Sequence, residues 1–287
     1  MSAVIADVIA IRVPERTWRS EARAVKTVWR RDMIRFAGNR AQVMTWLMQP
    51  LLFLFVLGSG LQALSAASTG GVDLKTFMFP GVLCVAVLFT AMISAASLVW
   101  DRELGFLREM MVAPVSRSSI VIGKCLGGAT IAASQGVIVL ALAGLVGVPY
   151  DPLLLLGALC MLVLLAFTVS AFGVLVAVSI KQAQTFTWVM QMAVFPMFFL
   201  SGALYPVAGL PAWLEVLTKI NPLTYAVDPM RHLVFSHLDV SDTAQQTLNP
   251  GVTWWGWQLP PLFEAGMVLL LGLAMLGVAI WKFSRTE

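Results

Sequence analysis

Long apolar segments alternate with short charged ones along almost the whole chain. Runs without Asp, Glu, Lys or Arg cover residues 41–72, 76–100, 125–150, 152–180, 182–214 and 265–281. Five of these six runs exceed the roughly 20 residues with which an α-helix crosses a hydrocarbon core of about 30 Å, and the last falls just short. The pattern predicts an all-α polytopic membrane protein with six transmembrane helices.

A seventh run free of charge, residues 243–263, is predicted to lie outside the membrane. It contains Gln, Asn, Gly and Pro, which would leave backbone and amide groups without hydrogen bonds in lipid. Its Trp254, Trp255 and Trp257 form an interfacial belt before the last span.

The composition agrees with a membrane protein, since 59% of the 287 residues are hydrophobic and only 12% are charged. With the N-terminus inside, sixteen of the 19 Lys and Arg residues fall on the cytoplasmic side, which leaves Lys75, Lys219 and Arg231 outside. Because basic residues favour the cytoplasmic side, we expect both termini in the cytoplasm. The net charge of +4 fits attraction to an anionic inner leaflet, and nucleic-acid binding has no separate support.

The segment before the first span, residues 1–42, has the pattern of an amphipathic helix between residues 14 and 40. One helical face gathers the apolar side chains of Trp18, Ala22, Val25, Trp29, Met33 and Phe36. The complementary arc gathers Arg19, Arg23, Lys26, Arg30, Arg31 and Arg35. A basic helix with tryptophans on its apolar face is typical of one that lies flat in the membrane interface. Packing of that face on another protein subunit is the alternative.

A charged segment between the second and third spans, residues 100–117, is the candidate for docking of a partner protein. Its candidate residues are Asp101, Arg102, Glu103, Leu104, Phe106, Arg108 and Glu109. They form a short helix that stops at Pro114, which cannot continue it. Solvated loops rarely carry so many large apolar side chains, so we expect a protein surface to cover them.

The fifth span carries an unusual number of polar side chains. Gln184 and Gln191 are seven residues apart and therefore share a helix face, with Trp188 between them. Amides in a membrane helix either hold helices together or line a wet path, and both interpretations remain open here. Gln184 and Gln191 are thus the candidates for the transport pathway.

The run over residues 182–214 is too long for one span and contains several Gly and Pro residues. We expect a span that ends near Leu204, a short helix from Pro211 to Ile220, a break at Asn221 and Pro222, and a second short helix through about residue 235. These re-entrant half-helices, residues 205–237, are predicted to lie on the external side. Broken backbone at membrane depth survives only when protein covers it or it faces a cavity.

The chain lacks the motifs of the common energy sources. The Gly123–Lys124 pair has Ser118 and Cys125 where a phosphate-binding loop has Gly and a hydroxyl residue, so we expect no nucleotide site and no enzymatic activity. His232 and His237 have no metal-site pattern around them, and no metal site is expected. Glu264 is the one ionisable residue placed inside a span, which is too few for an ion relay.

The segment LPAWLEVLTKINPLTYAVDPMRHL, residues 210–233, resembles the signature of type-2 ATP-binding-cassette (ABC) transporter permeases. The match rests on the spacing of Pro211, Trp213, Asn221, Pro222, Tyr225, Asp228 and Arg231. The segment DRELGFLREMMVAPVSR, residues 101–117, resembles the family's cytoplasmic coupling helix. The resemblance covers essentially the whole chain from residue 18 to residue 282.

The resemblance implies a bacterial inner-membrane permease subunit that pairs with a second permease and with separate ATPase subunits, which would bind ATP and Mg. It implies a connecting helix within residues 1–42 and a six-helix transmembrane domain over residues 43–282. Similarity to the daunorubicin-resistance branch of drug exporters implies multidrug efflux, antibiotic resistance and an amphipathic or hydrophobic small-molecule substrate. A homodimer is expected, with a heterodimer as its alternative. The other candidates are a polysaccharide or glycolipid permease and, from another class, a passive channel or membrane scaffold.

Overall fold

The computed structural model describes residues 17–60, 73–107, 110, 115–206, 210–238, 248, 250–254 and 257–286. The longer helices are α1 (Trp18–Gly38), α2 (Arg40–Leu51) with its π-helical continuation η1 (Leu52–Leu57), α4 (Leu74–Glu103), α6 (Arg117–Leu140), α7 (Pro152–Ser179), α8 (Ala183–Phe199) and α12 (Pro261–Thr286). The shorter elements are the 3-10 helix η2 (Ala143–Val146), α9 (Ala212–Ile220), α10 (Thr224–Phe235), β1 (Thr253–Trp254) and β2 (Trp257–Gln258).

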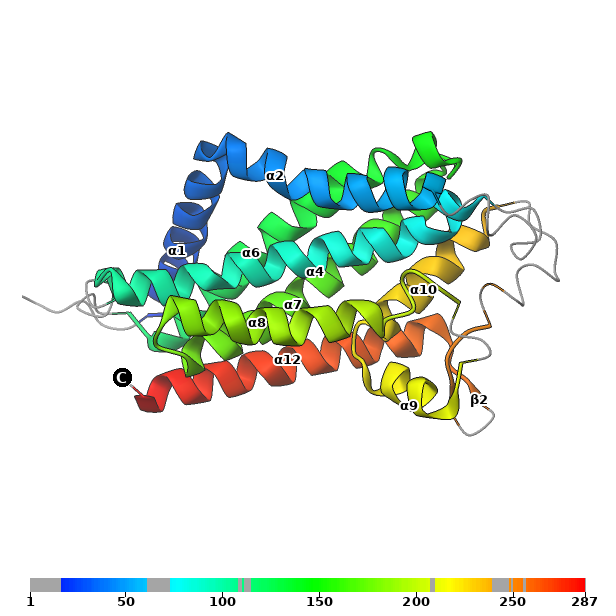
Figure 1. Cartoon of the computed structure of the whole chain (residues 1–287). Helices are drawn as coiled ribbons and strands as arrows, with labels where there is room; N and C mark the ends of the chain where they lie inside the picture. The colour runs from blue at the N-terminus through cyan, green and yellow to red at the C-terminus, as the bar shows by residue number, and fades with distance from the viewer. Residues whose placement is uncertain are drawn as a thin grey trace, which may run out of the picture.

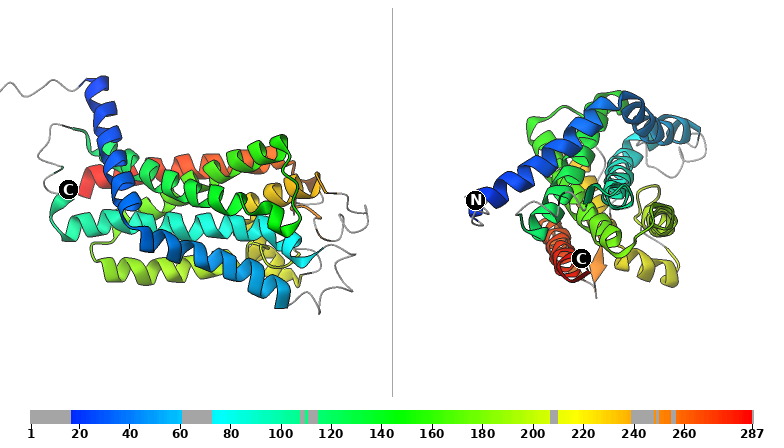
Figure 2. Two further views of the ribbon diagram at one scale, coloured as in Figure 1. Left: turned by 90° about the horizontal axis from the view of Figure 1, so that it is seen from above. Right: turned by 90° about the vertical axis from the view of Figure 1, so that its left-hand side faces the viewer.

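The long helices form a bundle with different elements at its two ends (Figure 1). Helices α2, α4, α6, α7, α8 and α12 run along the bundle, and α1 lies across one end, where α12 also finishes. Helices α9 and α10 and the β1–β2 hairpin lie at the other end (Figures 1 and 2). We call these the α1 end and the cap end, and we call α9, α10 and the hairpin the cap.

The predicted all-α polytopic membrane fold is confirmed. Five described helices are long and apolar enough to cross a membrane: Ala41–Gly60, Leu74–Glu103, Arg117–Leu140, Pro152–Ser179 and Pro261–Arg285. Helix α8, the predicted fifth span, has 17 residues and a length of about 26 Å. A sixth crossing by α8 therefore stays a prediction.

Helix α4 is the centre of the bundle and packs against α6 and α7. In the most apolar part of α4, 78% of the residues are buried, whereas the corresponding share is 17% in α2 and 22% in α12. Helix α8 buries one narrow stripe, Phe186, Met190, Val194 and Phe198. Helices α2 and α8 are thus peripheral and leave most of their surface for lipid or for a partner.

Side-chain caps fix where several helices begin. Asp73 accepts a hydrogen bond from Lys75 N at 3.0 Å and starts α4. Asp151 accepts one from Leu153 N at 2.7 Å and starts α7. Asn39 separates α1 from α2, because its N–H closes α1 and its side chain caps α2.

Helix α1 packs on α6 of the same chain, and its place in the membrane interface stays a prediction. Its buried residues are Val28 and Asp32, whereas Trp18 of the predicted apolar face is 86% exposed. Gly123 and Gly127 of α6 permit the approach: a Cβ at Gly123 would lie 2.8 Å from Val28 Cβ. The two glycines are four residues apart, a spacing that lets membrane helices come close.

Candidate functional site

At the α1 end, charged side chains from three helices meet in one buried group. Its members are Arg31, Asp32 and Arg35 of α1, Asp101 of α4 and Lys124 of α6. Lys124 Nζ lies 3.0 Å from Asp32 Oδ1 and 2.6 Å from Asp101 Oδ2. Arg31 also pairs with Asp101, and Arg35 Nη2 lies 3.3 Å from Asp101 Oδ1. We call these five residues the charge cluster.

The inner members of the charge cluster are shielded from solvent. The side chains of Asp101 and Lys124 are 0% and 1% exposed, and that of Asp32 is 6% exposed. A buried charge is tolerated only when paired, so these residues bind α1, α4 and α6 to one another. Asp32 and Lys124 were not among the sequence candidates. The sequence features that could have indicated them are an acidic residue next to arginines in Asp32 and a lysine among apolar residues in Lys124.

Helix α1 makes a second polar contact with α6 through Glu21. Its carboxylate accepts hydrogen bonds from Ser116 N at 3.0 Å, from Ser116 Oγ at 2.6 Å and from Ser119 Oγ at 2.6 Å. An acidic group at a helix N-terminus satisfies free N–H groups and complements the helix dipole. Helix α1 therefore holds the first turn of α6, which directly follows the predicted docking segment.

Two other candidate docking residues connect α4 to its neighbours. Arg102 Nη1 donates to the carbonyls of Ala177 and Ile180, at 3.1 and 2.8 Å, at the end of α7. Glu103 Oε1 accepts from Ala183 N at 2.7 Å, in the first turn of α8. Helix ends present unpaired carbonyls and N–H groups of these kinds. Consecutive residues of α4 thus contact the charge cluster, α7 and α8.

The exposed side chains of the predicted docking segment are mainly apolar. Leu104 and Phe106 are 68% and 44% exposed, and Gly105 between them, with φ of +83°, ends α4. Asp101 differs from the expectation of a surface contact, because its carboxylate is wholly buried in the charge cluster. Arg108 and Glu109 lie outside the described residues.

In the cap, the signature residues join its helices to the bundle. Asn221 Nδ2 donates to Met197 O at 2.7 Å, and its Oδ1 accepts from Leu223 N at 3.1 Å. Tyr225 Oη accepts from Trp254 Nε1 at 3.0 Å, which ties α10 to the hairpin. The break between α9 and α10 is therefore held from both sides.

The two prolines and the tryptophan of the signature have simpler surroundings. Pro211 precedes the first turn of α9, and Trp213 on that turn is 67% exposed. Pro222 lines an apolar cavity of about 210 Å³ between α7 and α12. Pro211 therefore marks the start of a helix, Trp213 exposes its ring, and Pro222 forms part of a cavity wall.

Asp228 and Arg231 hold two different structures in place. Arg231 is 2% exposed, donates to Gly202 O after α8, and its Cζ lies 4.5 Å from the centre of the Phe77 ring. Burial lowers the pKa of Arg231 to about 10. Because this value is still well above 7, the guanidinium is charged at neutral pH. Asp228 accepts from Val252 N at 3.2 Å; burial raises the pKa of this carboxyl, and the Val252 N–H opposes the rise. Arg231 thus holds the chain that follows α8, and Asp228 holds the residue before β1.

A groove of about 480 Å³ lies between α2 and α8, with α4 as its floor. Its lining is mostly apolar and includes Phe89, Trp100 and Phe195, together with the amides of Gln49 and Gln191. We call it the α2–α8 groove. It continues through Gln49 into a shallow hollow of about 880 Å³ along α2. Gln184 is exposed on α8 but does not line the groove.

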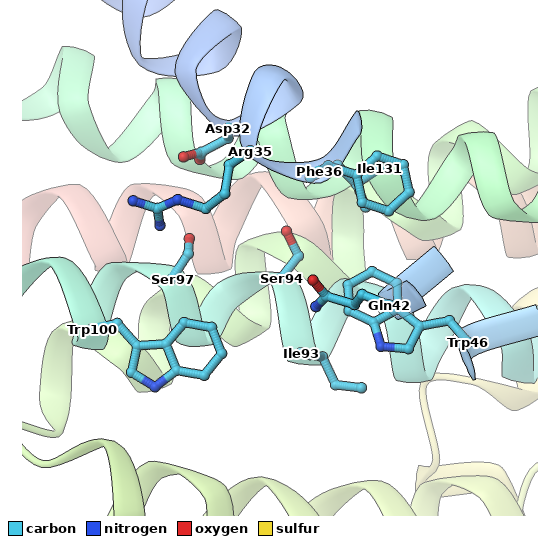
Figure 3. Close-up of a pocket in the computed structure, with 10 residues that line it drawn as sticks. All are labelled: Asp32, Arg35, Phe36, Gln42, Trp46, Ile93, Ser94, Ser97, Trp100 and Ile131. Carbon is cyan, nitrogen blue, oxygen red and sulfur yellow. The ribbon is translucent and has the colours of Figure 1, made fainter. Parts of the chain in front are cut away.

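A small pocket of about 60 Å³, lined by five polar and five apolar residues of α1, α2, α4 and α6, lies next to this groove (Figure 3). It shares Ile93 and Trp100 with the groove. Its other lining residues include Asp32, Arg35, Phe36, Gln42, Trp46, Ser94 and Ser97. We call it the polar pocket. It adjoins the charge cluster, which supplies Asp32 and Arg35 to its lining and whose Lys124 donates to Ser97 Oγ at 3.0 Å.

Comparison with known proteins identifies the family. The family model described as ABC-2 type transporter matches residues 23–235. The chain belongs to the ABC-2 type transporter family. Its matched region contains α1, the charge cluster, the groove helices and the signature element of the cap.

Relatives of the chain carry different names. The chain is 30% identical over 194 residues to "Putative transport permease ycf38" of Cyanophora paradoxa, covering 67% of each chain. It is 27% identical over 213 residues to "Nodulation protein J" of Rhizobium leguminosarum bv. trifolii, covering 73% of this chain and 80% of that one. It is 31% identical over 162 residues to "Probable multidrug ABC transporter permease YbhR" of Escherichia coli (strain K12), covering 54% of this chain and 43% of that one.

The family membership defines the general role of the chain. It is a multi-pass membrane protein and a permease subunit of an ABC transporter. A permease of this family works with an ATP-binding ATPase subunit.

Proposed function

We propose that this permease exports a hydrophobic or amphipathic small molecule, driven by ATP that a separate subunit hydrolyses. The observation that carries the proposal is the α2–α8 groove, whose lining combines aromatic and aliphatic side chains with two amides. A pocket of this kind, mostly apolar with a few placed polar groups, suits a small amphipathic ligand. A bare polysaccharide is the weaker candidate, because its hydroxyls would find few hydrogen-bond partners on such a wall.

The orientation proposed from the basic residues puts the α1 end in the cytoplasm and the cap outside. The exposed Leu104 and Phe106 then lie on the cytoplasmic side, where an ATPase can bind them. A push on this segment would reach α1 and α6 through the charge cluster, α7 through Arg102 and α8 through Glu103. Movement of α8 changes the width of the groove, which links ATP hydrolysis to alternating access.

A second permease subunit would complete the pathway. In one chain the groove has walls on α2 and α8 and a floor on α4. Exposed apolar residues continue along both walls, such as Met48 and Leu52 on α2 and Met192 and Phe199 on α8. A symmetric dimer that apposes these faces would enclose the conduit at its centre.

Reconstitution tests the proposal directly. The permease and its ATPase are placed in proteoliposomes, and ATP-dependent uptake of the fluorescent amphipathic dye Hoechst 33342 into inside-out vesicles is followed. A catalytically inactive ATPase is the control. Flux of dye that persists without ATP would support a passive channel. ATP hydrolysis stimulated by a glycolipid, with no dye uptake, would replace the small-molecule substrate with that class.

A further inference from the structure

We propose that the polar pocket binds the anionic headgroup, phosphate or carboxylate, of an amphiphile whose tail lies in the α2–α8 groove. The inference deepens the proposed function, on which it rests. Its first support is position, since Ile93 and Trp100 belong to both cavities. A ligand that spans the two would carry its polar end toward α1 and its apolar end along α4.

The volume of the polar pocket selects a small group. About 60 Å³ holds a few water molecules or one phosphate or carboxylate. The adjoining groove is about eight times larger and lined mainly by apolar side chains. The pair of cavities thus has the proportions of a headgroup and a tail.

The charges around the pocket favour an anion. Asp32 lines it, but its carboxylate already pairs with Lys124 at 3.0 Å and lies 3.7 Å from Arg31. Asp101 is likewise paired. The charge cluster holds three cations and two carboxylates, which leaves a net positive charge beside the pocket.

Arg35 is the residue that would contact the headgroup. Its side chain is 46% exposed, and Nη2 forms its contact with Asp101 at 3.3 Å. Figure 3 places the guanidinium beside Ser97 on the Trp100 side of the pocket, with Ser94 next along α4 and Trp46 at the opposite side. A guanidinium fork with neighbouring hydroxyls is a common way to bind phosphate or carboxylate.

Two probes with one tail separate headgroup binding from tail binding. Lysophosphatidate and monoacylglycerol, each with the same diazirine-labelled chain, are cross-linked to the permease–ATPase complex in phosphatidylcholine nanodiscs. For the wild type we expect the phosphate probe to reach half-saturation at a mole fraction about tenfold lower than the glycerol probe, as one charge-assisted contact implies. Arg35→Ala should remove most of this preference.

Three further variants make the test specific. Arg30→Ala removes one exposed cation from the same helix and should keep the preference. Arg35→Lys keeps the charge but loses the fork, and should retain part of it. Ser94→Ala leaves every ion pair of the charge cluster in place and should reduce the preference several-fold. Equal half-saturation of the two probes in the wild type, or an unchanged preference in both Arg35→Ala and Ser94→Ala, would mean that the pocket holds only water.

Transport of the probe then shows whether the anionic amphiphile is a transported substrate or a bound membrane lipid. In proteoliposomes, ATP-dependent movement of lysophosphatidate across the bilayer changes the amount that albumin extracts, and such a change would make the anionic amphiphile a substrate. Phosphate preference without ATP-dependent movement would make it a bound membrane lipid. Dye export with no phosphate preference would contradict headgroup binding in the polar pocket but would still support the proposed function. Phosphate preference with no ATP-dependent flux of any amphiphile would support headgroup binding in the polar pocket and contradict the proposed function.

Discussion

Lys124 Nζ on α6 lies 2.6 Å from Asp101 Oδ2 on α4, and neither side chain reaches solvent. The contact joins two central helices of the bundle, and Asp32 brings α1 to the same ammonium at 3.0 Å. An ion pair this deeply buried contributes less net stability than its attraction suggests, because both partners lose their hydration. Removal of only one partner is nevertheless costly, because the charge of the other partner stays buried without compensation.

We therefore expect Lys124→Met to destabilise the permease strongly. The substitution keeps much of the side-chain volume but leaves Asp32 and Asp101 with one fewer cation, at a cost of about 3–5 kcal/mol. Thermal unfolding of purified protein in detergent would report the loss as a lower Tm. Lys181→Met, in the exposed turn between α7 and α8, is the matched control and should leave Tm within a degree or two. An unchanged Tm for Lys124→Met would show that the charge cluster does not hold the helices.

The close contact of α1 with α6 gives a second prediction. A Cβ at Gly123 would lie 2.8 Å from Val28 Cβ, so Gly123→Val should push α1 away and cost about 1–3 kcal/mol. Gly277 on α12 has no atom within 4 Å of the corresponding position, and Gly277→Val serves as the control. Cysteine pairs between α1 and α6, cross-linked by a short reagent, would measure the separation. Equal cross-linking in both variants would contradict the packing described.

The sequence predicted the helices well because its signals there are local. The charge-free runs predicted the five described helices that are long and apolar enough to cross a membrane. The break before α10 was legible from Asn221 and Pro222 for the same reason.

The roles of charged residues could not be predicted in this way, because they depend on which helices meet. The sequence around Asp101 is equally compatible with a docking loop and with a buried ion pair. Only the contact with Lys124, 23 positions later, shows that Asp101 is buried and paired. Likewise, the helical face of α1 that packs on α6 contains Asp32, which a search for apolar stripes passes over. Contacts between distant segments are set by shape and by glycines such as Gly123 rather than by local pattern.

Phe106 should matter for coupling rather than for folding. It is 44% exposed at the α1 end, and Phe106→Ala should leave Tm unchanged while lowering ATP-dependent transport at least several-fold, because an interface core loses its aromatic anchor. Leu217→Ala, a smaller apolar truncation at a 41% exposed position in the cap, is the control. Normal transport by Phe106→Ala would exclude this residue from the docking surface.

Arg231 is expected to act as a structural residue of the cap. Arg231→Met leaves the Gly202 carbonyl without its donor and removes the cation above Phe77, which should cost about 2 kcal/mol or more. The folded yield of the variant, measured by size-exclusion chromatography, should fall, whereas Lys219→Met, a partly exposed position on α9, should retain normal yield. A normal yield with altered substrate preference would instead place Arg231 at the exit of the pathway.

Gln191 offers the most direct test of the α2–α8 groove. After replacement of Cys84, Cys125 and Cys160, Gln191→Cys should react with a small hydrophilic thiol reagent in at least one nucleotide state, because a transport groove that carries amides admits water and lipid does not. Gln184→Cys, on the same helix face but outside the groove lining, shows how far water extends along α8. Leu270→Cys, 68% exposed on α12, faces lipid in this arrangement and should remain unreactive. If Gln191→Cys is protected in both the resting and the ATP-bound complex while Leu270→Cys also fails to react, the amide of Gln191 holds helices together, and the pathway must run along another face of the permease.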